Sequence, residues 1–240
     1  MATTTATTAD APAHAPEHAH HPPHLQHHFV SSEQQFDSAK LGMWLFLITE
    51  ILLFSGMFVA YTVYRVWHPE TFTAASAFLD WRLGGLNTLV LLFSSYTVAL
   101  SIHYAQKDRL DRTFWMLVIT LACAGVFMVV KAFEYGGKFA EGVFPGEAFD
   151  PVGHYAPLAD IPYARQFFSI YFVMTGIHGF HVLVGMGIFF WLLFRVRRGD
   201  FNSEYYTHIE LAGLYWHLVD IIWIFLFPLL YLIGHGGGGH

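Results

Sequence analysis

The chain has 240 residues and a formal net charge of −6; 55% of its residues are hydrophobic and 12% are charged. Soluble domains carry roughly 25% charged residues, so this composition is typical of a membrane protein. With neither a basic patch nor a nucleic-acid motif, we expect no nucleic-acid partner. The single cysteine, Cys123, excludes an intrachain disulfide and a CxxC site.

The two ends of the chain differ in composition from the rest. Residues 1–36 are rich in Ala, Thr, Pro and His and contain too few apolar residues to fold alone. We expect a disordered cytoplasmic tail there, and a flexible Gly-rich tail over 235–240. The first tail includes a run of histidines with incidental metal affinity: His14, His18, His20, His21, His24, His27 and His28. It has no apolar signal-peptide core, so the first membrane helix is expected to direct insertion.

The region between the tails, residues 37–234, contains five long apolar segments. They cover residues 41–65, 85–106, 113–133, 166–195 and 209–234. Each reaches the roughly 20 residues that a helix needs to cross a bilayer. Because lipid cannot satisfy backbone polar groups and no alternating strand pattern recurs, helices are the expected elements. The sequence therefore predicts an all-α, polytopic bundle with five transmembrane helices.

Lysine and arginine residues indicate how the five segments are oriented. Seven lie on the N-terminal side of the membrane: Lys40, Lys107, Arg109, Arg112, Arg195, Arg197 and Arg198. The other side has five: Arg65, Arg82, Lys131, Lys138 and Arg165. This bias predicts a cytoplasmic N-terminus and an external C-terminus. The longest connection, about 134–165, then faces outward. Residues near segment ends are expected to anchor the interfaces: Trp44, Trp67, Trp81, Trp115 and Tyr231.

Several polar residues interrupt the apolar segments. Counting 1.5 Å per residue places Glu50, His178, His181 and Asp220 at a similar depth. A charged side chain at the bilayer centre costs at least ~2.5–3.5 kcal/mol and faces a protein interior or a partner. Two further candidates, Glu210 and His217, are seven residues apart and share one face of the last helix. We expect all six residues to form an intramembrane polar cluster.

Three roles for these residues remain open. A self-contained membrane metalloenzyme could use His178, His181, His217 and Glu50 to bind a metal ion, and haem ligation by histidines on opposed helices is also possible. Membrane di-iron enzymes, however, carry several HxxxH or HxxHH clusters, and the spans here hold a single HxxH. A proton relay is the second role. Hydrogen-bonded packing between helices is the interpretation that we favour.

Two local patterns support helix packing. Lys131 and Glu134 are three residues apart, a spacing that predicts an ion pair on one helix. Four glycines of the fourth segment are expected to let a neighbouring helix approach closely: Gly176, Gly179, Gly185 and Gly187.

Five stretches, one touching each segment, carry a family resemblance. They are WLFLITEILLFSGMFVAY (44–61), LNTLVLLFSSYTVALSIHYA (86–105), KAFEYGG (131–137), TGIHGFHVLVGMGIFF (175–190) and ELAGLYWHLVDIIWIFLFPLLYL (210–232). In order and spacing the sequence resembles subunit III of the haem–copper oxidases, the cytochrome c oxidase polypeptide III family. Only the tails and the outer loop fall outside the resemblance.

The resemblance implies a non-redox subunit of a bacterial inner-membrane oxidase. Such a subunit lies beside subunit I, with subunit II in the same complex, and haem and copper are expected on those partners rather than on this chain. The family's subunit III steadies subunit I, sustains proton uptake and binds phospholipid, while cytochrome c donates electrons to the complex. No catalytic residue and no metal ligand is expected here. Glu50 matches the family's intramembrane glutamate, and Arg195 resembles a basic residue associated with lipid headgroups.

The sequence also departs from many family members. Mitochondrial-type members have seven helices, whereas five are predicted here, so the walls of the family's lipid cleft are incomplete. Quinol-oxidase and nitric-oxide-reductase relatives share the five-helix plan. Their first helix tends to carry aspartate at the position of Glu50, which favours a cytochrome c oxidase.

Overall fold

The computed structural model describes residues 31–203 and 205–234, and helices dominate this part of the chain. The helices are α1 (Ser32–Trp67), α2 (Pro69–Ser76), α3 (Trp81–Ala105), α4 (Leu110–Ala140), η1 (Gly146–Ala148), η2 (Gly153–Asp160), α5 (Ala164–Arg198), α6 (Thr207–Phe227) and η3 (Pro228–Leu232). Five of them, counting α6 together with η3, are long and apolar enough to cross a membrane. The predicted all-α membrane bundle is confirmed.

The first helix begins earlier than the apolar pattern predicted. Ser31 caps it, because its side-chain oxygen accepts a hydrogen bond from the backbone N–H of Gln34 at 3.1 Å. Glu33 in the first turn complements the helix dipole. Residues 32–36 are therefore helical, although the sequence placed them in the N-terminal tail. The histidines of that tail and the Gly-rich end, 235–240, lie outside the described residues.

The connection predicted over about 134–165 is shorter than expected. Helix α4 continues to Ala140, because Glu134 and Lys138 are buried against the bundle instead of facing solvent. Hydropathy could not anticipate this, since it scores both residues as polar loop. The short helix α2 was also missed; it starts with Pro69 at its first position, where the absent N–H costs nothing.

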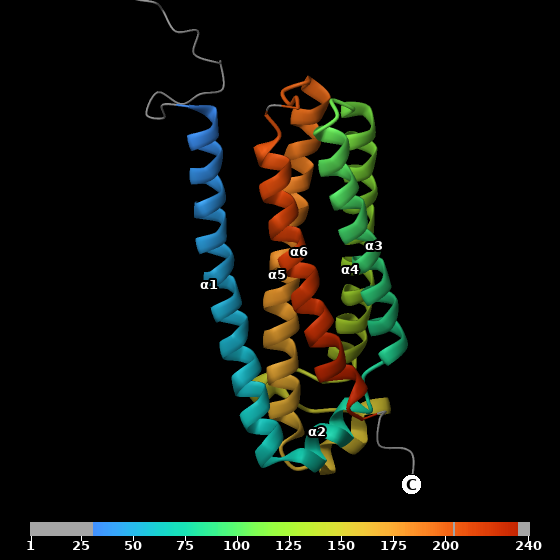
Figure 1. The fold of residues 1–240 in the computed structure, drawn as a ribbon. Helices are drawn as coiled ribbons and strands as arrows, with labels where there is room; N and C mark the ends of the chain where they lie inside the picture. The colour runs from blue at the N-terminus through green and yellow to red at the C-terminus, as the bar shows by residue number, and fades with distance from the viewer. Residues whose placement is uncertain (1–30, 204, 235–240) are drawn as a thin grey trace, which may run out of the picture.

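Helix α6 lies at the centre of the bundle and α1 at its edge. Half of the residues in the most apolar stretch of α6 are buried within the chain, whereas 11% of those in the corresponding stretch of α1 are buried. Figure 1 shows α1 leaning away from α5 and α6 toward its N-terminal end, with α3 and α4 on the opposite side. Along α1 the residues buried against the bundle recur every seven positions: Leu47, Phe54 and Tyr61.

One end of the bundle, which we call the α2 end, gathers α2, the C-terminal ends of α1, α4 and α6, and the first turns of α3 and α5 (Figure 1). The last carbonyls of a helix have no partner within it. Here the carbonyl of Leu229 accepts from the hydroxyl of Tyr61 on α1. The carbonyl of Leu230 accepts from Ser76 on α2 at 2.7 Å. Hydroxyl groups thus fasten α1 and α2 to the end of α6.

Only one of the four glycines expected to thin the fourth segment does so within the described residues. A Cβ at Gly185 would lie 2.6 Å from the Trp216 ring, so α5 and α6 pack closely at this point. A Cβ at position 176, 179 or 187 would have nothing within 4 Å, so close packing does not require a glycine at these positions.

Candidate functional site

Glu50 on α1 and His181 on α5 form a direct polar contact between these two helices. The Nε2 atom of His181 lies 2.8 Å from a carboxyl oxygen of Glu50, and its Nδ1 lies 2.8 Å from the carbonyl of Ile177. A carbonyl only accepts, so Nδ1 carries a hydrogen. The contact between Nε2 and the carboxyl oxygen then needs a single proton, which is held either by Nε2 or by the carboxyl group. In both arrangements the pair is neutral overall, which suits its depth in the helices.

His217 and its neighbour Trp216 link α6 to α3. The Nδ1 atom of His217 lies 2.7 Å from the hydroxyl of Ser95, and the indole N–H of Trp216 donates to Ser94 at 2.9 Å. About two turns further along α6, the indole N–H of Trp223 donates to the hydroxyl of Thr88 at 3.1 Å. These contacts support the interpretation of His217 as an interhelical hydrogen-bonding residue.

His178 does not join such a network, and Asp220 lies next to it. Both side chains are buried. The Asp220 carboxyl group interacts with Ser95, the residue that contacts His217, without a hydrogen bond of regular geometry, and the ring nitrogens of His178 have no hydrogen-bond partner among the described residues. The His178 ring packs instead against the rings of Phe127 and Trp223, with centroids 5.6 and 5.2 Å away. Counting residues along each helix predicted a similar depth for these residues. Depth alone does not specify the direction in which a side chain points.

The remaining two predicted residues lie near the end of the bundle opposite α2. Glu210 pairs with Lys40 of α1 at 2.8 Å and has no contact with His217. Arg195 pairs with Asp200 at 2.9 Å, and its guanidinium lies 5.2 Å from the Trp191 ring and 5.1 Å from the Phe201 ring. The six-residue cluster predicted from the sequence is therefore wrong as one assembly. Four of its members form contacts between helices, as the pairs Glu50–His181, His217–Ser95 and Glu210–Lys40, while His178 and Asp220 are buried without a hydrogen bond of regular geometry.

The four residues considered as metal ligands do not converge. Glu50 and His181 contact each other, His217 contacts Ser95, and His178 lies between aromatic rings. In the part of the chain that the structure describes, no three His, Cys, Asp or Glu side chains come together in a way that could hold a metal ion. The geometry does not favour the metal-site interpretation.

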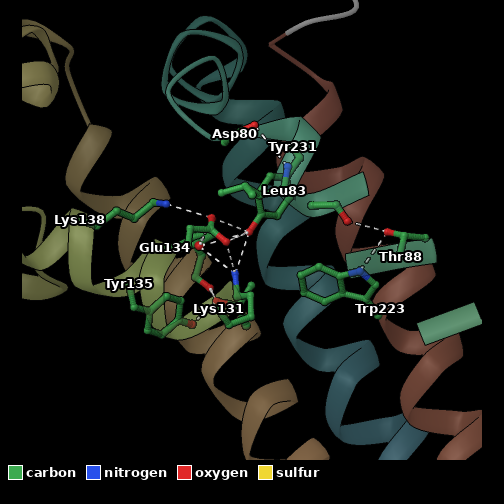
Figure 2. Close-up of polar contacts among 12 residues, drawn as sticks. Asp80, Leu83, Thr88, Lys131, Glu134, Tyr135, Lys138, Trp223 and Tyr231 are labelled. Carbon is green, nitrogen blue, oxygen red and sulfur yellow. Dashed lines mark hydrogen bonds and ion pairs between the residues drawn. The ribbon is translucent and has the colours of Figure 1, made fainter. Parts of the chain in front are cut away.

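A buried cluster of charged and phenolic side chains lies near the α2 end, around Glu134 (Figure 2). Lys131 donates to Glu134 at 2.8 Å, to Tyr171 at 3.1 Å and to Tyr231 at 2.8 Å. Both phenols donate in turn to Glu134 at 2.8 Å, and Lys138 donates to the same carboxylate at 3.0 Å. All five side chains are buried, and they tie α4 to α5 and to the end of α6. We call these five residues the Glu134 cluster.

Charge and hydrogen bonding together account for the Glu134 cluster. Two ammonium groups face one carboxylate, and a buried charge is tolerated only when it is paired and hydrogen-bonded. Lys131 uses all three ammonium hydrogens, and four donors reach the Glu134 carboxylate. The spacing of Lys131 and Glu134 predicted their ion pair, which is confirmed.

The other members of the cluster were not expected. Lys138 sits four residues after Glu134, a spacing that could have revealed it. Tyr171 and Tyr231 gave no such signal. Tyr231 was expected to anchor the membrane interface, and that expectation is wrong: the residue is fully buried, because its hydroxyl reaches the carboxylate of Glu134.

Comparisons with known proteins place these features in a family. A family model described as cytochrome c oxidase subunit III matches residues 158–235. A cytochrome c oxidase subunit 3 of Thermostichus vulcanus is 32% identical over 204 residues, which cover 82% of this chain and 88% of that protein. A probable quinol oxidase subunit 3 of Staphylococcus haemolyticus is 30% identical over 197 residues, covering 81% of this chain and 89% of the relative.

The similarity to the Thermostichus and Staphylococcus proteins extends over four fifths of the chain, far beyond any single motif. It agrees with a helical bundle whose five long helices can span a membrane. The chain belongs to the subunit III family of the haem–copper oxidases.

Proposed function

We propose that this chain is an accessory, non-redox subunit of a proton-pumping cytochrome c oxidase in a bacterial inner membrane. It would lie beside subunit I, with subunit II in the same complex, and haem and copper would reside on those partners. The observation that carries the proposal is the use of polar side chains. Glu50, His181, His217 and the Glu134 cluster make contacts between helices of this chain, the arrangement of a scaffold.

The same contacts suggest how the subunit would act. The bundle is held together from within at three levels, so its outer apolar surface is available to steady subunit I. The neutral Glu50–His181 pair gives a position where a proton is held at membrane depth, which supports a contribution to sustained proton uptake. Arg195, between two aromatic rings near the end opposite α2, has the charge and position to hold a phospholipid headgroup. The α2 end would face outward and the N-terminus the cytoplasm.

Two electron donors are candidates for the complex, cytochrome c and a quinol. The Thermostichus relative is named a cytochrome c oxidase subunit, whereas the Staphylococcus relatives, at 30% and 28% identity, are named probable quinol oxidase subunits. A glutamate at position 50 favours cytochrome c, and a quinol oxidase is the second candidate.

Purification of the chain with its partners tests the proposal. The full chain, carrying an affinity tag, is isolated from membranes in mild detergent, and co-purifying chains, haem spectra and metal content are measured. We expect larger oxidase subunits to co-purify, haem and copper to follow those subunits, and reduced cytochrome c to be oxidised faster than quinol. Stoichiometric haem or iron on the isolated 27.3 kDa chain would overturn the non-redox assignment. Faster quinol turnover would support the second candidate.

A further inference from the structure

A pocket of about 560 Å³ opens at the α2 end, next to the Glu134 cluster. The first turn of α3, the last turns of α4 and the start of η2 form its walls. The residues that matter below are Asp80, Arg82, Phe133, Lys138 and Tyr155. Since α3 begins and α4 ends here, the pocket lies where the membrane-spanning helices reach the polar boundary of the bilayer.

One part of this pocket offers hydrogen-bond donors that carry positive charge. The Lys138 side chain is 2% exposed, yet within the described residues it donates one hydrogen bond, to Glu134. An ammonium group has three hydrogens, so two remain for a ligand. Arg82 lines the same pocket, and its guanidinium lies 5.7 Å from the centroid of the Trp81 ring. A phosphate oxygen is a strong acceptor for both groups.

Another part is acidic and aromatic. One carboxyl oxygen of Asp80 accepts hydrogen bonds from the backbone N–H groups of Arg82 and Leu83, which leaves the second oxygen available. The rings of Trp81 and Tyr155 line the pocket beside it. Burial, followed by the negative charges of Glu134, Glu141 and Asp80, raises the pKa of Tyr155 to about 12. A carboxylate beside aromatic rings is the environment that binds an ammonium group.

Groups of both signs line the pocket. Asp80 is negative and Arg82 is positive, while Lys138 is one of two ammonium groups that share the Glu134 carboxylate. A ligand that carries both charges would find a partner for each, whereas a simple anion or a simple cation would find a partner for its one charge. This arrangement favours a zwitterion.

The surface of α4 extends the pocket toward the membrane interior. Phe133 lines the pocket and is 77% exposed, and Val129 and Val126, one and two turns inward, are 54% and 48% exposed. These side chains follow one face of the helix. An acyl chain leaving the pocket would therefore lie against an apolar track.

We propose that this pocket binds the headgroup of a zwitterionic phospholipid from the leaflet at the α2 end. The phosphate contacts Lys138 and Arg82, the ammonium group contacts Asp80 and the aromatic rings, and one acyl chain follows Phe133 and Val129. The site lies at the opposite end of the bundle from Arg195. It extends the lipid binding included in the proposed function, to a different leaflet.

Native mass spectrometry of the full chain in detergent tests the site. The probes are phosphatidylethanolamine, which is zwitterionic, phosphatidylglycerol, which is anionic, and inorganic phosphate. We expect phosphatidylethanolamine to bind most tightly. Arg82→Gln and Asp80→Asn should each weaken it about tenfold, because each removes one charge-assisted contact. Asparagine still caps α3, so Asp80→Asn preserves the helix start.

A matched variant serves as control. Arg165→Gln changes an exposed arginine at the same end that does not line the pocket. It should leave phosphatidylethanolamine binding unchanged. The site is overturned if Arg82→Gln and Asp80→Asn bind this lipid as the unaltered chain does. It is also overturned if phosphatidylglycerol or inorganic phosphate binds equally well. Either result leaves the co-purification of oxidase subunits untouched, so the two proposals fail separately.

Discussion

At the scale of single residues, pairing decides whether a polar side chain stabilises the helices or costs free energy. The Glu50 carboxyl group and the His181 imidazole share one proton and present no net charge at membrane depth. The Glu134 carboxylate accepts hydrogen bonds from four donors. The ring nitrogens of His178 are buried and unpaired among the described residues, whereas the Asp220 carboxyl group lies beside the hydroxyl of Ser95.

Substitutions at Glu50 separate hydrogen bonding from proton exchange. In Glu50→Gln the amide can donate to Nε2 of His181, so we expect stability within about 1 kcal/mol of the unaltered protein and most oxygen-reduction activity to remain. Glu50→Leu leaves Nε2 unpaired and should cost about 1–3 kcal/mol. Thermal unfolding of the purified complex and the amount of this chain retained in it report the effect. Exposed Glu33→Gln serves as control. Complete loss of turnover in an intact Glu50→Gln complex would argue for a direct role in proton transfer.

Glu134 should tolerate replacement far less well. Glu134→Gln removes the one carboxylate that faces two buried ammonium groups, and we expect a loss of about 3–5 kcal/mol in the free energy of unfolding. The same change at exposed Glu70 on α2 should have little effect. The triple variant Lys131→Met, Glu134→Leu, Lys138→Met should regain most of the stability, because no unpaired charge remains. If Glu134→Gln unfolds at the temperature of the unaltered chain, the cluster does not stabilise the fold.

At the scale of helices, the contact between α5 and α6 depends on the small size of residue 185. A Cβ there would lie 2.6 Å from the Trp216 ring, so Gly185→Ala must push this ring aside and should cost about 1–3 kcal/mol. Gly176→Ala on the same helix meets nothing within 4 Å and should be neutral or stabilising by up to about 1 kcal/mol. Thermal unfolding in detergent compares the two. Equal effects would show that helix propensity, and not close packing, governs position 185.

How far the sequence predicts the structure depends on the kind of information each feature needs. Hydropathy predicted the five spans, because each helix must present apolar residues to lipid over its whole length. It misplaced the start of α1 and the end of α4, where Ser31 supplies a cap and Lys138 finds a buried partner. The pair Lys131–Glu134 followed from helical spacing alone. The contacts of Tyr171 and Tyr231 depend on how three helices pack, and no pattern along the chain encodes that directly.

At the scale of the whole molecule, five spans place successive connections at alternate ends of the bundle. Lys107 lies between α3 and α4, and Glu147 lies between α4 and α5; both are exposed. In a Cys123→Ser background we expect Glu147→Cys to react with an impermeant maleimide on intact cells, and Lys107→Cys to react only after the membrane is opened. The reverse pattern would invert the orientation that the lysine and arginine bias predicts, without changing the fold.

The central position of α6 has a consequence for biosynthesis. The ribosome makes this helix after α1 and α3, yet Lys40, Tyr61 and Ser94, on these two earlier helices, all take their partners from it or from η3. A chain released before residue 207 would leave these side chains without those partners. Synthesis of α6 is then the event that completes these contacts, and a membrane protease can distinguish a chain with α6 from one truncated before it by this difference.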